Sequence, residues 1–444
     1  MLPSLPEINY ARPEGRGILI LRFARFTLIP GMNAGVFSLG IIRKNLRRKY
    51  TWLLTSVILV CGIFFLGFVV VSRPSFIAKF LPPVAASAVP KQEVFGFAPY
   101  WTLSKMDNVD WDTLTTFAYF SLPVFADGSI DRTSYEWGVF ESPKLANLFE
   151  KAKSHDVRRV VTLTQMEPYD IRLFLYDEEA WENTTAETIA ILNNRELDGV
   201  NIDFEFMPSD DYLRSRFSKF IAYFSERVEA ETKQNPYITV SVIASSAKDN
   251  KIYDLGFLAK HTDGIFMMAY DFYYPGSEKI GPSAPFYGYN NGKGPFWYDV
   301  STAVDDFLKV APADKIIMGV PYYGWNYPSV DPQPKADRSW GSSFATTQEK
   351  VNSNQLLMTT PLGGWDDDAK VSWRGYWDET GWHVVYMEDK KSLSLKYDFA
   401  KEKNLAGVGI WALGFDEGEK SFWETLSEKF PGENRINLAD AKTH

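Results

Sequence analysis

Eight short apolar runs recur along the chain after residue 93, and stretches with helical spacing separate several of them. The clearest such stretch is 212–233, where one helical face carries Leu213, Phe217, Phe220, Ile221 and Phe224. Nearly continuous apolar strands that alternate with helices indicate a parallel sheet buried on both faces. Eight such units predict an α/β fold, a (β/α)8 TIM barrel; seven strands or an open doubly wound sheet is the alternative. The runs are VFGFAPYW, TTFAYFSL, RRVVTLTQM, DGVNIDFEF, YITVSVIAS, GIFMMAYDF, KIIMGVPYYG and GVGIWALG.

The interval between the seventh and eighth runs is roughly twice as long as the others. Its excess, about 326–388, predicts a small α+β insertion over the carboxyl-terminal face of the barrel, where barrel enzymes keep their sites. The insertion is rich in tryptophan. These side chains could line a cleft with flat stacking surfaces or form a small aromatic core, and both alternatives stay open for Trp340, Trp365, Trp373, Trp377 and Trp382.

The segment 51–71 carries no charged residue, and a bilayer core is spanned by about 20 apolar residues in a helix. The preceding flank is basic, with Arg43, Lys44, Arg47, Arg48 and Lys49. The positive-inside rule therefore predicts one transmembrane helix, a cytoplasmic amino terminus and an extracellular remainder. The alternative is a secretory signal that is cleaved near Ala86-Ser87-Ala88, which would release the protein.

These features divide the chain into five parts. We expect a basic cytoplasmic tail at 1–50, the membrane helix at 51–71, a proline-rich linker at 72–92, the barrel with its insertion at 93–430 and a polar tail at 431–444. The protein is expected to be a monomer.

The net charge of −9 argues against a general nucleic-acid-binding protein, which would present a basic face. The single cysteine, Cys61, has no internal disulfide partner, and the four histidines lie far apart without ligand spacing. No GxGxxG follows the first strand, so a dinucleotide site has no support. We expect neither a metal nor another cofactor.

Polar residues interrupt the fourth apolar run. Side chains alternate along a strand, so Asn201, Asp203 and Glu205 share one face, and the apolar residues between them face the helices. The polar set then points into the barrel, where burial of two carboxyl groups raises their pKa values and favours a shared proton. Glu205, nearest the rim, is the natural proton donor. A purely structural hydrogen-bond layer is the alternative.

These residues resemble family 18 of the glycoside hydrolases, the chitinases and related N-acetylglucosaminidases. DGVNIDFE looks like the DGxDxDxE signature of that family, and further similarities follow in the family's order over about 93–425. They are MAYD at 268–271, like MxYD; MGVPYYG at 318–324, like GxPxYG; GIW at 409–411; and DKKSL at 389–393 with Lys396, like DDxxSLxxK.

The resemblance implies a retaining hydrolysis in which the 2-acetamido group of the substrate is the nucleophile. By match to the motifs, Glu205 would be the general acid and then the base. Asp203 would bind the acetamide N–H and stabilise the cation, and Tyr270 would donate to the acetamide carbonyl. Asp271 would bind sugar hydroxyls and Trp411 would form the floor under the scissile sugar. The alternatives are a core phenol for Tyr270 and a barrel plug for Trp411.

We also expect Asn201, Met268, Tyr100 and Tyr323 to contribute to substrate binding. The sequence departs from the chitinase pattern at Asn201, where the family has Asp, and at 162–166, where many chitinases have SxGG. The asparagine form is closest to bacterial cortex-lytic and peptidoglycan enzymes and is also similar to chitobiases. Peptidoglycan and chitin both remain possible substrates. The alternative functions are a non-catalytic sugar-binding barrel at the cell surface and a wall-anchoring protein.

Overall fold

The computed structural model of the protein describes residues 92–205, 208–249 and 251–431. The predicted basic tail, membrane helix and linker, up to residue 91, lie outside this part of the chain, as does the polar tail after residue 431. Among the helices that the structure describes, none combines the length and the apolar character needed to cross a bilayer.

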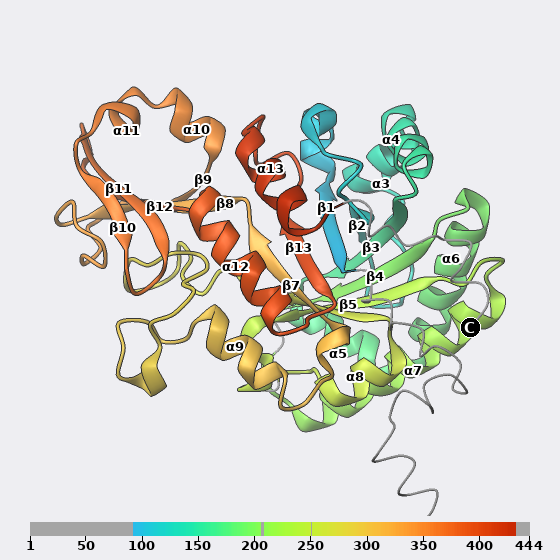
Figure 1. Ribbon diagram of the computed structural model, residues 1–444. Coiled ribbons are helices and arrows are strands. Elements are labelled where there is room, and N and C mark those ends of the chain that lie inside the picture. The colour runs from blue at the N-terminus through green and yellow to red at the C-terminus, as the bar shows by residue number, and fades with distance from the viewer. Residues whose placement is uncertain (1–91, 206–207, 250, 432–444) are drawn as a thin grey trace, which may run out of the picture. The chain divides into compact units, whose positions relative to one another are not determined.

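Eight parallel strands close into a barrel, which confirms the predicted fold (Figure 1). Each strand coincides with one of the predicted apolar runs to within one residue at either end, or lies inside it. Around the barrel the order is β1-β13-β7-β6-β5-β4-β3-β2, and pairing of β1 with β13 closes the ring. The strands are β1 Glu93–Pro99, β2 Thr116–Pro123, β3 Arg158–Gln165, β4 Gly199–Phe204, β5 Tyr237–Ile243, β6 Gly264–Met268, β7 Ile316–Pro321 and β13 Gly407–Trp411.

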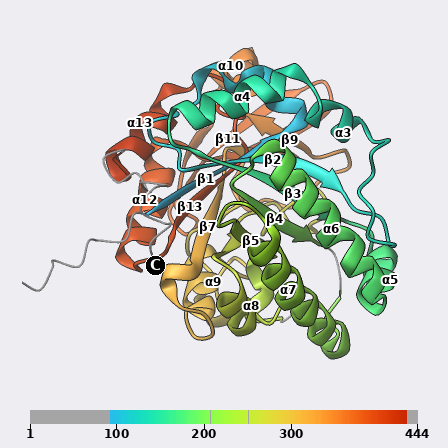
Figure 2. The same ribbon diagram turned by 90° about the vertical axis from the view of Figure 1, so that its right-hand side faces the viewer.

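Helices surround these strands (Figure 2). The helix predicted at 212–233 is α7, Asp211–Glu231, whose first turn is capped because Asp210 accepts a hydrogen bond of 2.9 Å from the backbone N–H of Leu213. Its predicted apolar face is buried. The other helices are α3 Tyr135–Phe140, α4 Pro143–Ser154, α5 Pro168–Tyr176, α6 Glu178–Arg195, α8 Leu255–His261, α9 Val300–Phe307, α12 Lys390–Glu402 and α13 Lys420–Lys429.

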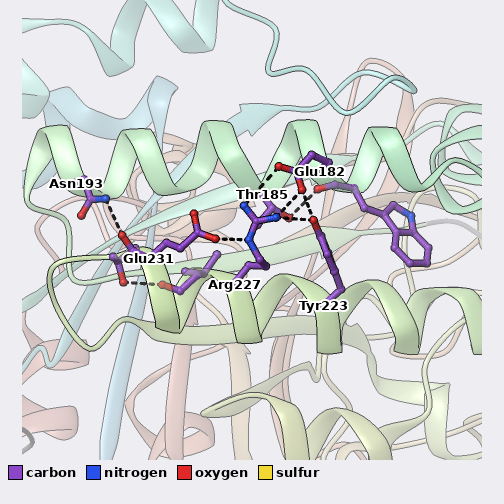
Figure 3. Close-up of polar contacts among 9 residues, drawn as sticks. Glu182, Thr185, Asn193, Tyr223, Arg227 and Glu231 are labelled. Atoms are coloured by element: carbon purple, nitrogen blue, oxygen red, sulfur yellow. Dashed lines mark hydrogen bonds and ion pairs between the residues drawn. The ribbon is translucent and has the colours of Figure 1, made fainter.

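Polar contacts join α6 to α7 on the outside of the barrel (Figure 3). The guanidinium of Arg227 donates to Glu182 at 2.5 Å and to the hydroxyl of Tyr223 at 2.7 Å, and it also pairs with Glu231. Asn193 donates to the backbone carbonyl of Glu231 at 3.1 Å. Such exposed contacts contribute little stability individually, but together they fix the two helices side by side.

The barrel interior is filled by aromatic rings. The ring of Phe97 lies 4.9 Å from that of Phe95 and 4.7 Å from that of Phe266, between centroids. A side chain at Gly409 would place its Cβ 2.0 Å from the ring of Phe266, so only glycine leaves room for this ring. Trp411 rests on the cluster, 5.6 Å from Phe97. The packed interior therefore forms a floor for whatever lies at the carboxyl-terminal end.

The insertion expected at about 326–388 is a five-stranded antiparallel sheet with two short helices, drawn in orange in Figure 1. It begins at Tyr323, directly after β7 ends at Pro321, so it extends from the carboxyl-terminal face of the barrel. The strand order is β10-β11-β12-β8-β9. Its elements are β8 Tyr323–Ser329, β9 Phe344–Thr347, α10 Gln348–Ser353, α11 Gln355–Thr359, β10 Gly363–Asp366, β11 Val371–Asp378 and β12 Gly381–Met387.

The DKKSL stretch has a structural role at the end of the insertion. Asp389 caps α12 by accepting from the backbone N–H of Ser392 at 2.9 Å, and the Ser392 hydroxyl accepts from the N–H of Asp389 at 2.8 Å. The next turn contributes Lys396, which pairs with both carboxylate oxygens of Glu388 at 2.8 Å. Both partners of this ion pair are almost completely buried. The ion pair therefore attaches Glu388, at the end of the insertion, to helix α12 of the barrel.

Candidate active site

A cavity of about 740 Å³ lies at the carboxyl-terminal end of the barrel strands. Its wall is formed by residues from β1, from the ends of β4, β5, β6 and β13, from the loops after β5 and β6 and from the first strand of the insertion. They are Phe97, Asp203, Glu205, Ser241, Ile243, Ser245, Lys251, Met268, Tyr270, Asp271, Tyr274, Pro275, Trp297, Trp325 and Trp411. The cavity thus combines carboxyl groups with flat aromatic surfaces.

Asp203 and Glu205 lie at the end of β4, on the face that alternation predicts. The backbone N–H of Glu205 donates to the carbonyl of Gln165 at the end of β3, at 3.0 Å, and this bond positions the residue. Burial, the main cause, and the negative charge of Asp271, the second, together raise the pKa of Glu205 to about 7. Burial, together with the charge of Glu205, holds the pKa of Asp203 well above its usual range. Glu205 therefore holds a proton near neutral pH.

Asn201 lies beneath this pair and is completely buried. Its side-chain carbonyl accepts from Thr239 at 2.8 Å, and its amide donates to Ser241 at 3.0 Å. Both polar atoms of the Asn201 side chain are thus hydrogen-bonded to hydroxyls of β5, and the side chain places no charge next to Asp203. One carboxyl oxygen of Asp203, Oδ1, makes no hydrogen bond within the described residues. Because a buried polar atom without a partner is costly, this oxygen is available to a ligand.

Asp271 is held by three donors on one oxygen. Its Oδ1 accepts from the Tyr323 hydroxyl at 2.5 Å, from the Trp325 indole N–H at 3.0 Å and from the Ser283 hydroxyl at 3.1 Å. Burial raises the pKa of Asp271, and these three hydrogen bonds lower it. The residue has a φ of 55°, a left-handed conformation that non-glycine residues rarely adopt. The backbone there is held by tertiary contacts, as is common at functional sites.

Aromatic rings form the rest of the wall. The ring of Trp411 lies 6.4 Å from that of Tyr270 with an angle of 22° between the ring planes. Burial and the charges of Asp203 and Glu205 raise the pKa of Tyr270 well above 10, so its hydroxyl remains a hydrogen-bond donor. Met268 fills the wall beside it. The cavity wall therefore brings together a hydrogen-bond donor (Tyr270), a flat aromatic ring (Trp411) and an acid (Glu205).

Six of the predicted site residues line the cavity together, and three do not. The six are Glu205, Asp203, Tyr270, Asp271, Trp411 and Met268. Asn201 is shielded by the residues above it, so direct contact with a substrate, as predicted, does not fit this structure. Tyr323 is buried and acts on Asp271, which makes it a positioning residue. Tyr100 contacts Trp101 and Tyr135 instead, with ring centroids 4.8 Å and 5.6 Å away.

The sequence interpretation missed the outer wall. Trp297 and Tyr274 come from the long loop after β6, Lys251 from the loop after β5, and Trp325 from the start of the insertion. Only Tyr274 and Trp325 carried a signal, because each follows a matched motif by a few residues. The five tryptophans singled out in the insertion line no part of this cavity. Trp340 is fully exposed, for example.

Among the described residues, no group of three or more His, Cys, Asp and Glu side chains is arranged to hold a metal ion. The chemistry available to the site from these residues is acid–base chemistry on a ligand that stacks against aromatic rings.

Known proteins share the family and the fold of this chain. The sequence profile of the family described as "Glycosyl hydrolases family 18" matches residues 93–416. "Uncharacterized glycosylase YvbX" of Bacillus subtilis is 26% identical over 257 residues, which cover 56% of this chain and 66% of that protein. "Cortical fragment-lytic enzyme" of the same species is 22% identical over 315 residues, which cover 66% of this chain and 65% of that protein. The chain thus matches just under two thirds of the length of these curated relatives.

Among solved structures, the Group IV chitinase of Ostrinia furnacalis superposes with a TM-score of 0.66 at 19% identity. The superposition covers 76% of this chain and 99% of the chitinase chain. At this level of identity the likeness shows a common fold.

Proposed function

Since the chain belongs to family 18 of the glycosyl hydrolases and is a glycosidase of that family, we propose that it cleaves β-linked N-acetylglucosamine glycans by a substrate-assisted, retaining mechanism. The observation that carries this proposal is the state of Glu205. A carboxyl group with a pKa of about 7, at the wall of an aromatic cavity, is protonated often enough near neutral pH to act as a general acid.

In the proposed first step, Glu205 donates its proton to the glycosidic oxygen while the bond from that oxygen to the anomeric carbon breaks. The carbonyl oxygen of the substrate's own 2-acetamido group forms the new bond to the anomeric carbon. The product is a cyclic oxazolinium ion. Water then attacks the same carbon while the bond from that carbon to the acetamido oxygen breaks, which restores the acetamido group. Glu205, now a carboxylate, takes the proton from that water.

Asp203 and Tyr270 orient the acetamide in this proposal. The Asp203 oxygen without a partner accepts from the acetamide N–H, and the positive charge that develops beside it favours ionisation of Asp203. The Tyr270 hydroxyl donates to the acetamide carbonyl. Burial of the Asp203 carboxyl group and the Tyr270 hydroxyl excludes water from around them. Each hydrogen bond to the acetamide is therefore stronger than it would be in solution.

Trp411 and Asp271 bind the sugar ring itself. The indole face supports the apolar face of the sugar, and the second carboxylate oxygen of Asp271 accepts from a sugar hydroxyl. Both assignments fit the positions of these side chains in the cavity wall.

The names of two curated relatives, an endochitinase and the cortical fragment-lytic enzyme, are in line with the two substrates that the sequence leaves open, chitin-type oligosaccharides and peptidoglycan. Both contain N-acetylglucosamine in β linkage, so the proposed chemistry serves either. We further propose that the chain is anchored through residues 51–71 with the barrel outside the cell, because the basic flank precedes that segment.

The test uses the full chain in mild detergent, as the wild type and as Glu205→Gln, incubated with chitooligosaccharides and with purified peptidoglycan. Mass spectrometry of the products should reveal fragments ending in reducing N-acetylglucosamine that depend on Glu205. Glu226→Gln, an exposed change on α7, is the matched control and should keep full activity. Retention of either glycan without cleavage by the wild type would instead support a sugar-binding protein.

A further inference from the structure

The cavity wall contains a cation that the proposed mechanism does not use. Lys251 lies in the loop after β5, beyond the short 3₁₀ turn Ala244–Ala247, and only 25% of its side chain is exposed. Of the described residues that form the wall, it alone carries a positive charge. The other ionisable acidic groups there are the carboxyl groups of Asp203, Glu205 and Asp271.

The loop that carries Lys251 is attached to the aromatic wall. The ammonium of Lys248, three residues earlier, lies 4.8 Å from the ring centroids of Tyr289 and Tyr298 and 5.7 Å from that of Trp297. The three rings belong to the segment after β6, so these cation–π contacts join that segment to the loop after β5. One of the rings, Trp297, also lines the cavity. Lys248 therefore fixes the loop, and the neighbouring Lys251 contributes to the wall.

Lys251 has spare hydrogen-bonding capacity. Its ammonium pairs with Oδ2 of Asp249 at 2.7 Å, and the other oxygen of Asp249 accepts from Ser209 at 2.8 Å. An ammonium has three donors, and Asp249 is its one ion-pair partner among the described residues, which leaves two donors for a ligand. A partly exposed ion pair contributes little to stability, so pairing with Asp249 does not by itself account for a lysine at the cavity wall.

The charges around the cavity favour an acidic over a neutral glycan as the ligand of Lys251. A neutral polymer offers hydroxyl and acetamide groups, which uncharged side chains can match without taking an ammonium out of water. An anionic glycan would be repelled by the carboxylate of Asp271 unless a cation stood nearby. The net charge of −9 gives the chain no general attraction for anionic polymers, so such recognition must be local.

We propose that Lys251 binds a carboxylate substituent on a sugar of the bound glycan, and that the preferred substrate is an acidic glycan, the alternating N-acetylglucosamine and N-acetylmuramic acid strand of peptidoglycan after its stem peptides have been removed. The carboxylate is that of the 3-O-lactyl group of muramic acid, which is free only where no stem peptide is amide-bonded to it and which chitin lacks. This inference rests on the proposed function and selects between its two substrates.

The experiment compares two substrates that differ only in carrying a charged carboxylate or an uncharged amide on the lactyl group. Glycan strands freed of stem peptides are used as such and after conversion of the lactyl carboxylates to amides. The full-length wild type should cleave the acidic strands with a kcat/KM about tenfold above that for the amidated strands. Lys251→Met should remove this preference, and Lys251→Arg should keep most of it. Lys260→Met, an exposed change at the end of α8, should leave the preference intact.

Both substrates are measured on the same preparation, so the ratio is independent of the fraction of folded protein. Equal rates on acidic and amidated strands by the wild type would overturn the inference, even if Lys251→Met were inactive. A ratio that Lys251→Met leaves unchanged would overturn it as well. Cleavage of chitooligosaccharides alone would refute the role of Lys251 and leave the proposed function standing. Cleavage of no glycan would refute both.

Discussion

The hydroxyl of Tyr323 donates a hydrogen bond of 2.5 Å to Oδ1 of Asp271. Tyr323 is the first residue of β8, and Trp325 of the same strand donates to the same oxygen at 3.0 Å. The first strand of the insertion therefore opposes the effect of burial and lowers the pKa of a carboxyl group at the carboxyl-terminal end of the barrel. That carboxyl in turn raises the pKa of Glu205. The insertion is thus part of the electrostatics of the site as well as a neighbour of the cavity.

Tyr323→Phe should narrow the pH range of activity from the acid side. Hydrogen bonds to its charged form lower the pKa of Asp271, so loss of one donor raises it. If ionised Asp271 is required, activity is lost at a higher pH on the acid side of the kcat/KM profile than in the wild type. Tyr327→Phe on the same strand is the control, because that buried hydroxyl makes no hydrogen bond within the described residues. An acid limb that moves equally in both variants would contradict this role for Tyr323.

Asp271→Asn should narrow the range from the basic side. Burial is the main cause of the pKa of about 7 at Glu205, and the charge of Asp271 is the second. Removal of that charge lowers the pKa of Glu205. Because the protonated form is the acid, activity falls as pH rises through this pKa, and the basic limb should move to lower pH. A basic limb that stays in place or moves upward would show that Asp271 does not act on Glu205.

The positions of the central site residues could be predicted from alternation within single strands. That rule placed Asp203 and Glu205 on the inner face of β4, and the (β/α)8 order put β4, β6 and β13 around one volume. Alternation gives the face of a side chain but not whether a ligand can reach it, so the shielding of Asn201 from a substrate could not be predicted. Lys251 and Trp297 lie on loops without periodicity, and their contribution depends on tertiary contacts between two loops.

Trp411→Ala should weaken substrate binding, because the sugar loses its stacking surface. We expect KM to rise about tenfold, given the energy of aromatic stacking. Trp411→Phe, which keeps a flat ring over Phe97, should lose less. Steady-state kinetics with chitooligosaccharides measure both variants, and thermal unfolding identifies any loss of packing. An unchanged KM in a folded Trp411→Ala variant would exclude Trp411 as the floor of the site.

Lys396→Met should destabilise the fold strongly. The change leaves Glu388, which is 3% exposed, without the ammonium that neutralises it. Loss of one partner of a buried ion pair destabilises a protein by about 3–5 kcal/mol. The double variant Glu388→Gln with Lys396→Met removes both charges and should recover much of that loss. Urea unfolding of the three proteins gives the free energies, and a double variant as unstable as the single would contradict an ion-pair role.

The configuration of the first product tests the proposed mechanism most directly. Proton NMR during hydrolysis of a chitooligosaccharide by the full chain resolves the α and β anomers before they equilibrate. The mechanism predicts that the β anomer appears first and that Glu205→Gln lowers the rate by about 10²–10⁴-fold, the usual contribution of a general acid. An α anomer that appears first, or a normal rate in Glu205→Gln, would contradict it.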